Sequence, residues 1–384
     1  MSAPLDGIVV VALEQAVAAP FATRQLADLG ATVLKVERPG EGDFARNYDS
    51  KVAGQSGFFV WCNRAKQSIE LDLKDPADSE RFHRLIAGAD VFIQNLSYQA
   101  AKRAGIDAET LHARHPHLIA CDVNGYGGGG PRTDDKAYDL AIQAEGGAFA
   151  LTGTADEMSK VGFSVADIAS AMYALTSILA ALHRRAVTGE GAAIEVSMLE
   201  SIAEWTAAPV YTAAHTGVVP TRAGRRHALI APYGLFPLAD GRQVLVAVQA
   251  DREWRSMAEH TLGDAALGVD PRFVTNQDRI ANVDELEAII RERFAAQSAE
   301  DTIAALERGR VAFAFARTPL EVWNHEQLRA RDRIAPIATP TGVAECYRSP
   351  FHISECPEPV AVVPALGEHD PALVALIESR AAGH

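Results

Sequence analysis

The chain has 384 residues, 48% of them hydrophobic, so it can bury more core than one ordinary domain needs, and we expect two domains. Its formal net charge of -14 gives no general electrostatic reason to bind nucleic acid or an anionic membrane surface. Four scattered cysteines do not make a disulfide framework. The N-terminal residues show neither a signal-peptide pattern nor a membrane span, so we expect a soluble cytoplasmic protein with no membrane association and no nucleic-acid partner.

Strand and helix patterns alternate through the first third of the chain. Apolar, β-branched runs predict strands at residues 7–13, 31–36, 68–73, 90–94 and 118–123, and helical patterns occupy residues 20–29 and 78–87. Alternation of this kind favours a parallel sheet covered by helices, which is an α/β fold.

The strongest helix pattern runs from residue 165 to residue 186, with apolar side chains recurring every three or four positions. Arg184 and Arg185 in its last turn, followed by Gly189, are typical of a helix end. The stretch 216–227 then precedes two strand patterns at 229–238 and 243–248, with helices near residue 254 and at 283–294 and 301–308. We interpret this region as a second, smaller α+β domain.

Asp167 lies near the start of the long helix, three residues after Ser164. That spacing is typical of a capping box, in which two side chains bond to the backbone at a helix N-terminus. The position also favours chemistry, because a helix N-terminus stabilises a carboxylate, keeping it ionised and able to attack a carbonyl carbon. The residues alone leave both interpretations open.

Two turns resemble nucleotide sites without matching them. Residues 14–20 lack the GxGxxG pattern of a dinucleotide-binding site. This turn is either an ordinary strand-to-helix connection or an anion-binding helix N-terminus at which the Gln15 amide donates hydrogen bonds. The glycine run 127–130 lacks the Lys-Ser or Lys-Thr of a P-loop. We expect a turn, or a flexible active-site loop whose N–H groups stabilise an oxyanion.

Basic residues stand near predicted strand ends, such as Arg38 and the pair Lys102 and Arg103. They either grip phosphates at the ligand-binding edge of the sheet or are ordinary surface cations. Cys346 and Cys356 bracket His352, but this spacing fits no standard zinc site, so we expect no metal.

Five segments, taken together and in order, resemble the class III CoA-transferases, a family that includes formyl-CoA transferase, carnitine CoA-transferases and the related α-methylacyl-CoA racemases. The segments cover nearly the whole chain and read PLDGIVVVALEQAVAAPFATRQLADLGATVLKVERPGEGDFAR, NRAKQSIELDLK, GYGGGGPRTDDKAYDLAIQAEGG, GFSVADIASAMYALTSILAALHRR and PALGEHD.

The resemblance implies a Rossmann-like large domain, a smaller domain and an interlocked homodimer. The large domain would take residues 1–215 and 330–384 and the small domain 225–325, with linkers at 216–224 and 326–329. The family's catalytic aspartate falls on Asp167, and no tightly bound cofactor is implied beyond CoA as a substrate. The residues expected to bind the acyl group are Gln15, Tyr138 and Asp139. The residues expected to bind CoA are Arg38, Leu71, Asn95, Lys102 and Arg103.

The reaction implied by the resemblance moves CoA from an acyl-CoA thioester to a carboxylic acid through an aspartyl-CoA thioester on Asp167. Arg225 and Arg226 stand where formyl-CoA transferase has a glycine-rich lid, which argues against formyl or oxalate transfer. The segments AVAAPFATRQLADLGA and AYDLAIQAEGG are more similar to those of family members that use C4 and C5 dicarboxylic acids. The two arginines would bind the distal carboxylate of such an acid.

Two alternatives stay open. An α-methylacyl-CoA racemase needs a base on each side of the α-carbon, and the family's racemases supply a His-Asp step where this chain has Tyr138 and Asp139. No histidine occurs between His117 and His183, so the second base is missing. A catalytically silent CoA-binding protein would keep the same fold, but the presence of Asp167 argues against it.

Overall fold

The computed structural model describes residues 2–358 and 361–381, and the chain forms two compact units. The first unit holds residues 1–148, 160–217 and 328–384, and the second holds residues 149–159 and 218–327. The segment 149–159 had been expected in the large domain. It belongs to the second unit, where the Arg222 guanidinium donates to the carbonyls of Thr154 and Ala155.

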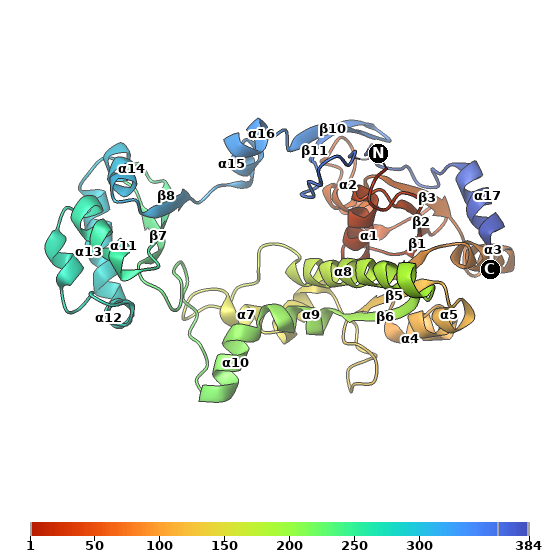
Figure 1. Cartoon of the computed structure of the whole chain (residues 1–384), viewed down its shortest axis with the longest axis horizontal. Helices are drawn as coiled ribbons and strands as arrows, with labels where there is room; N and C mark the ends of the chain where they lie inside the picture. Colours follow the sequence, from red (N-terminus) through yellow and green to blue (C-terminus); the bar gives the residue numbers. More distant parts are fainter. Residues whose placement is uncertain (1, 359–360, 382–384) are drawn as a thin grey trace. The chain divides into compact units, whose positions relative to one another are not determined.

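A six-stranded parallel sheet forms the centre of the first unit (Figure 1), which confirms the predicted α/β class. Its strands run in the order β3-β2-β1-β4-β5-β6, the Rossmann order. The first five lie within a few residues of their predicted positions. The sixth was not predicted, because its residues AAIEVS include two alanines, Glu195 and Ser197 and so form no clear apolar run. The strands are β1 (Val9–Leu13), β2 (Thr32–Glu37), β3 (Lys66–Glu70), β4 (Val91–Gln94), β5 (Ile119–Asn124) and β6 (Ala192–Ser197).

Helices cover both faces of this sheet. On one face α1 (Ala18–Asp28) packs along α8 (Val165–Thr188), and alanines on both helices let them approach closely. On the other face α3 (Pro76–Ala87), α5 (Ala108–Arg114) and α17 (Pro371–Arg380) share a second apolar core. The remaining helices of residues 44–216 are η1 (Phe44–Asn47), α2 (Gly57–Asn63), α4 (Tyr98–Ala104), α6 (Asp139–Glu145), α7 (Ala148–Leu151), α9 (Met198–Trp205) and α10 (Ala207–Thr216).

Helix α8 is the long helix predicted from residue 165, and it continues two residues beyond the predicted end. Gly189 closes it with a φ of 77°, a left-handed conformation that glycine adopts without strain. By length and composition α8 alone among the described helices could cross a membrane, but half of its apolar window is buried in the first unit. That burial is typical of a core helix in a soluble protein.

The C-terminal segment returns to the first unit, which the sequence pattern alone did not show. The hairpin of β10 (Ile334–Thr339) and β11 (Gly342–Tyr347) packs its apolar side on Phe59 and Val60 of α2. Further on, the Arg81 Nε of α3 donates to the Glu378 Oε1 of α17 at 2.7 Å. Throughout residues 2–358 and 361–381, no three His, Cys, Asp or Glu side chains gather as metal ligands.

The second unit has its own core around Trp254, Phe236 and Phe294. Its antiparallel sheet has the order β7-β8-β9. The strand expected to start at residue 229 starts at Tyr233, because Pro232 has no N–H to donate to a neighbouring strand. The elements from residue 233 to residue 330 are β7 (Tyr233–Pro237), β8 (Gln243–Ala247), α11 (Asp251–Ser256), η2 (Met257–Thr261), η3 (Ala265–Val269), α12 (Asn276–Ala281), α13 (Val283–Ala295), α14 (Ala299–Arg308), β9 (Ala312–Phe315), α15 (Pro319–Trp323) and α16 (Glu326–Ala330).

Candidate active site

The strand order reverses between β1 and β4, and open α/β sheets bind ligands at the carboxyl ends of the strands at such a switch point. Gln15 follows β1 and Asn95 follows β4. The Asn95 Oδ1 accepts the Gln15 N–H at 2.9 Å, and the Asn95 Nδ2 donates to the Gln15 carbonyl at 2.8 Å. Both polar groups of the Asn95 amide therefore hold the turn at Gln15.

A cavity of about 620 Å³ opens at this edge of the sheet, a size typical of small-molecule sites. We call it the catalytic cavity. Five predicted site residues line it together, namely Gln15, Asn95, Tyr138, Asp139 and Asp167. Sequence reasoning missed Tyr48, Phe58, Asn124 and Lys136, which also line it. The available signal was that Tyr48 closely follows one of the family-like segments and Lys136 lies within another.

Asp167 sits in the first turn of α8, half-buried at the cavity wall. The Ser164 side chain makes no capping hydrogen bond, so the capping-box interpretation is wrong. The cap comes from another helix: the Asp139 Oδ1 of α6 accepts the N–H groups of Ala166 and Asp167 at 2.9 and 3.2 Å. Because Asp139 takes this role, the Asp167 carboxyl group is left facing the cavity.

The Asp167 carboxyl group has its pKa raised from 3.8 to about 7, first because burial disfavours its charged form and then because the Asp139 carboxylate lies close by. The start of α8 does not offset this rise in the pKa of Asp167. The N–H groups that would stabilise the anion are bonded to Asp139 instead.

Both oxygen atoms of Asp139 accept hydrogen bonds from the protein. Its Oδ2 accepts from the Gln143 Nε2 at 2.7 Å, and the Gln143 Oε1 in turn accepts the Val161 N–H at 3.0 Å. These bonds tie α6 to the segment that leads into α8. Asp139, predicted as a substrate-binding residue, lines the cavity. Its oxygen atoms accept hydrogen bonds from Gln143 and from the first turn of α8, which holds Asp167 in place.

A buried charge network supports the turn that follows β1. The Lys66 Nζ contacts the Glu14 Oε1 at 2.7 Å, and the Lys35 Nζ contacts the Asp43 Oδ2 at 2.9 Å, with all four side chains inaccessible to solvent or nearly so. The Asp43 Oδ1 accepts the Ala16 N–H at 3.1 Å. Ala16 has a φ of 61°, a conformation that costs free energy for a residue with a Cβ and persists because such bonds impose it.

A further cavity of about 520 Å³ shares Gln15 and Phe44 with the catalytic cavity and is lined by Arg38 and Arg46. Arg38 is exposed and pairs with Glu41 at 2.8 Å. Arg46 is committed to Glu37, with its Nη2 at 2.6 Å from the Glu37 Oε1. Arg38 is thus the cation that an anionic ligand can recruit here without breaking a buried pair.

The other predicted CoA contacts are not brought to either cavity. Leu71 is buried and donates its N–H to the Glu37 carbonyl at 3.0 Å. The Lys102 ammonium donates to Asp107 and Glu109, each at 2.8 Å. Arg103 is exposed at the end of α4.

The glycine run is a braced turn. The N–H groups of Gly127, Gly128 and Gly130 donate to the side chains of Asn124, Glu195 and Thr133 at 2.6, 2.9 and 3.0 Å. Three of its four N–H groups are therefore already bonded, and the expected oxyanion-stabilising loop is not supported at these positions.

Comparisons with known proteins identify the family of the chain. Residues 5–370 match the family model described as CoA-transferase family III. A succinate–glutarate CoA-transferase from Agrobacterium fabrum is 33% identical over 98% of this chain and 96% of its own length. A succinyl-CoA:mesaconate CoA-transferase from Haloarcula marismortui is 34% identical over 95% of this chain and 94% of its own length. The crystal structure of a CAIB/BAIF family protein from Brucella suis has a TM-score of 0.85 and 34% identity, covering 98% of this chain and 100% of that one. The resemblance is confirmed, and the chain belongs to CoA-transferase family III.

Proposed function

We propose that the protein transfers CoA from an acyl-CoA thioester to a carboxylic acid, with the half-buried Asp167 carboxyl group at the wall of the catalytic cavity as its nucleophile. That placement is the observation on which the proposal depends. Relatives that act on succinate, glutarate and mesaconate favour a C4 or C5 dicarboxylic acid as one partner.

The reaction we propose needs one nucleophile from the protein, the carboxylate of Asp167. It attacks the donor thioester carbonyl, which expels CoA thiolate and leaves a mixed anhydride. The thiolate attacks the aspartyl carbonyl, which releases the donor acid and forms an aspartyl-CoA thioester. The acceptor carboxylate then attacks this thioester, and the thiolate takes the acceptor acyl group from the second anhydride. Asp167 is regenerated, and no proton is gained or lost overall.

Proton transfer at the α-carbon, the racemase alternative, finds less support. It requires two bases, and the residues that line the catalytic cavity include no histidine. Tyr138 stands where the family's racemases have a histidine. It is 71% exposed, so it lacks the burial that shifts the pKa of a catalytic acid or base. A silent CoA-binding protein would not need the precisely capped helix start that leaves Asp167 facing the cavity.

Arg38 is the side chain we propose for the CoA phosphates, with Gln15 beside the reacting carbonyl. Of the two arginines expected to bind a distal carboxylate, Arg226 loses support, because it pairs with Asp284 at 2.7 Å and lies near Glu287 at 3.7 Å. We further propose a cytoplasmic, interlocked homodimer, as in the family the chain belongs to.

Trapping the covalent intermediate tests this function. The protein is incubated with succinyl-CoA, quenched with hydroxylamine and analysed by peptide mass spectrometry, with Asp167→Ala as the control. We expect a hydroxamate on Asp167 and on no other residue, because hydroxylamine cleaves an aspartyl thioester or anhydride. An unmodified Asp167 after incubation with several acyl-CoA donors would contradict the transferase mechanism, and α-proton exchange in deuterated water would then be measured.

A further inference from the structure

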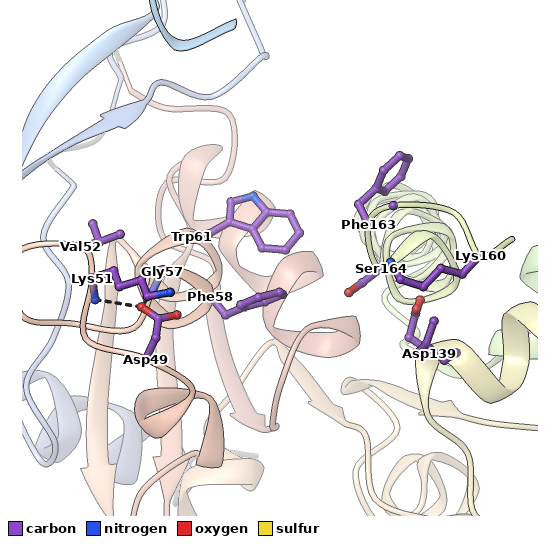
Figure 2. Close-up of a pocket in the computed structure, with 12 residues that line it drawn as sticks. Asp49, Lys51, Val52, Gly57, Phe58, Trp61, Asp139, Lys160, Phe163 and Ser164 are labelled. Atoms are coloured by element: carbon purple, nitrogen blue, oxygen red, sulfur yellow. Dashed lines mark hydrogen bonds between the residues drawn. The ribbon is translucent and has the colours of Figure 1, made fainter. Parts of the chain in front are cut away.

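A third cavity, of about 670 Å³, adjoins the catalytic cavity in the first unit, and the proposed reaction does not yet use it. We call it the aromatic cavity. The two cavities share Phe58, Asp139, Leu140 and Ser164, so a ligand whose reacting carbon lies at Asp167 can extend from one into the other. Figure 2 shows Phe58 and Trp61 on one side of the aromatic cavity, with Phe163, Ser164 and Asp139 on the other.

The walls of this cavity are apolar and aromatic. A row of rings leads into it from the catalytic cavity: Tyr48 meets Phe58 edge-on at 5.6 Å between centroids, and Phe58 meets Trp61 at 6.1 Å. Across the cavity, the Phe163 side chain is 61% exposed. Exposed rings grouped around a hollow favour the binding of a carbon chain, because the chain removes their surface from water.

The charged groups of the cavity leave two cations available. The Asp49 Oδ1 accepts the N–H groups of Lys51 and Gly57 at 2.9 and 3.3 Å, and the Asp139 oxygen atoms are bonded as described above. In the described part of the chain, the Lys51 ammonium has no ion pair or hydrogen bond, and the Lys160 ammonium donates only to the Val161 carbonyl at 3.3 Å. The two lysines stand on opposite sides of the cavity in Figure 2. An anion entering here meets cations that need not give up a carboxylate partner.

We propose that the aromatic cavity binds the far end of a dicarboxylic acyl group, with its carbon chain against Phe58, Trp61 and Phe163 and its distal carboxylate attracted by Lys51 and Lys160. This inference rests on the proposed function and names the residues that would select a dicarboxylic over a monocarboxylic substrate. Aromatic side chains beside two lysines, in a lining whose two aspartates already accept hydrogen bonds, match a short chain that ends in a carboxylate better than they match a longer alkyl chain.

The test compares succinyl-CoA with butyryl-CoA, which have the same four-carbon chain and differ in the distal carboxylate. The rate of hydroxamate formation on Asp167 is measured at subsaturating thioester for the unaltered protein, Lys51→Met, Lys160→Met and the double variant. Lys51→Arg and Lys160→Arg keep the charge, and Arg252→Met removes an exposed cation elsewhere. We expect the double variant to lose about tenfold in rate with succinyl-CoA and less than about twofold with butyryl-CoA, because a charge-assisted contact is lost only with the former.

The outcomes separate the two proposals. Restoration of the succinyl preference by the arginine variants would support the subsite. A double variant that keeps the preference of the unaltered protein would overturn the subsite and leave the transferase function standing. If the unaltered protein forms no adduct from these two thioesters or from other acyl-CoA donors, the proposed function fails, and this inference fails with it.

Discussion

Asp167 faces opposing requirements at the scale of a single residue. A nucleophilic carboxylate must be ionised, yet burial and the nearby Asp139 raise its pKa to about 7. The desolvation that raises the pKa also makes the anion more reactive once it forms, because fewer water molecules must be displaced from it.

The pH dependence of aspartyl adduct formation should follow from this pKa. Below about pH 7 the Asp167 carboxyl group is protonated and cannot attack, so the rate should rise with pH and level off above pH 7. We expect about a tenfold lower rate at pH 6 than at pH 8, measured as single-turnover hydroxamate formation. A rate that stays constant between pH 6 and pH 8 would show that the Asp167 carboxyl group titrates outside this pH range.

Asp139→Asn is the matched variant for this profile. The asparagine Oδ1 can still accept the N–H groups of Ala166 and Asp167, but its negative charge is gone. The pH at which the rate reaches half its maximum should therefore move to lower pH, because one of the two causes of the raised pKa is removed. Asp139→Ala also removes the cap and should lower the maximum rate. A purely structural role for Asp139 would leave the midpoint unchanged in both variants.

At the scale of the elements, buried charges link β1, β2 and β3. Glu14, Lys35 and Lys66 follow or lie on these strands, and Asp43 joins them from the loop after β2. Such an arrangement adds little net stability over apolar packing, but removing one member leaves a buried charge without its partner. Here the network also fixes Ala16 beside the catalytic cavity.

Lys35→Met should destabilise the protein by about 3–5 kcal/mol, since Asp43 then stays buried without its cation. The change is measured as the free energy of unfolding in urea. Arg84→Met is the control, because Arg84 pairs with Glu80 at 2.9 Å on the exposed surface of α3 and should cost less than about 1 kcal/mol. Equal stability losses in the two variants would contradict the role given to the buried network.

At the scale of the whole molecule, the isolated chain leaves apolar surface uncovered. None of the ten residues of α10 is buried, and Tyr211 on this helix is 60% exposed. Neighbouring Trp205 and Val210 are also exposed. Grouped side chains of this kind are typical of a surface that another chain covers, which supports the proposed homodimer.

Light scattering should therefore give twice the 41.1 kDa mass of the chain. If the two chains interlock, they cannot separate without unfolding. A mixture of tagged and untagged dimers should then form no mixed dimers under native conditions, and should form them after unfolding and refolding. A monomer by light scattering would contradict the dimer, and free exchange between native dimers would contradict interlocking alone.

The sequence by itself determined the elements whose patterns are local. Strands β1 to β5, the long α8 and the helices α13 and α14 follow from apolar periodicity over adjacent residues. The same pattern placed Asp167 at a helix start, but only the resemblance to the class III CoA-transferases marked it as the nucleophile. The strand β6 escaped notice because its residues lie at the edge of the sheet, where only part of each side is buried and the pattern is weak.

Only the tertiary structure decided what surrounds Asp167. Its cap comes from Asp139, 28 positions earlier, and the turn at Gln15 is held by Asn95, 80 positions later. The aromatic cavity likewise joins α2 to the start of α8. No local pattern records such pairs, because parallel strands place residues that are distant in the chain at one edge of the sheet. The chemistry of the site depends on those long-range contacts.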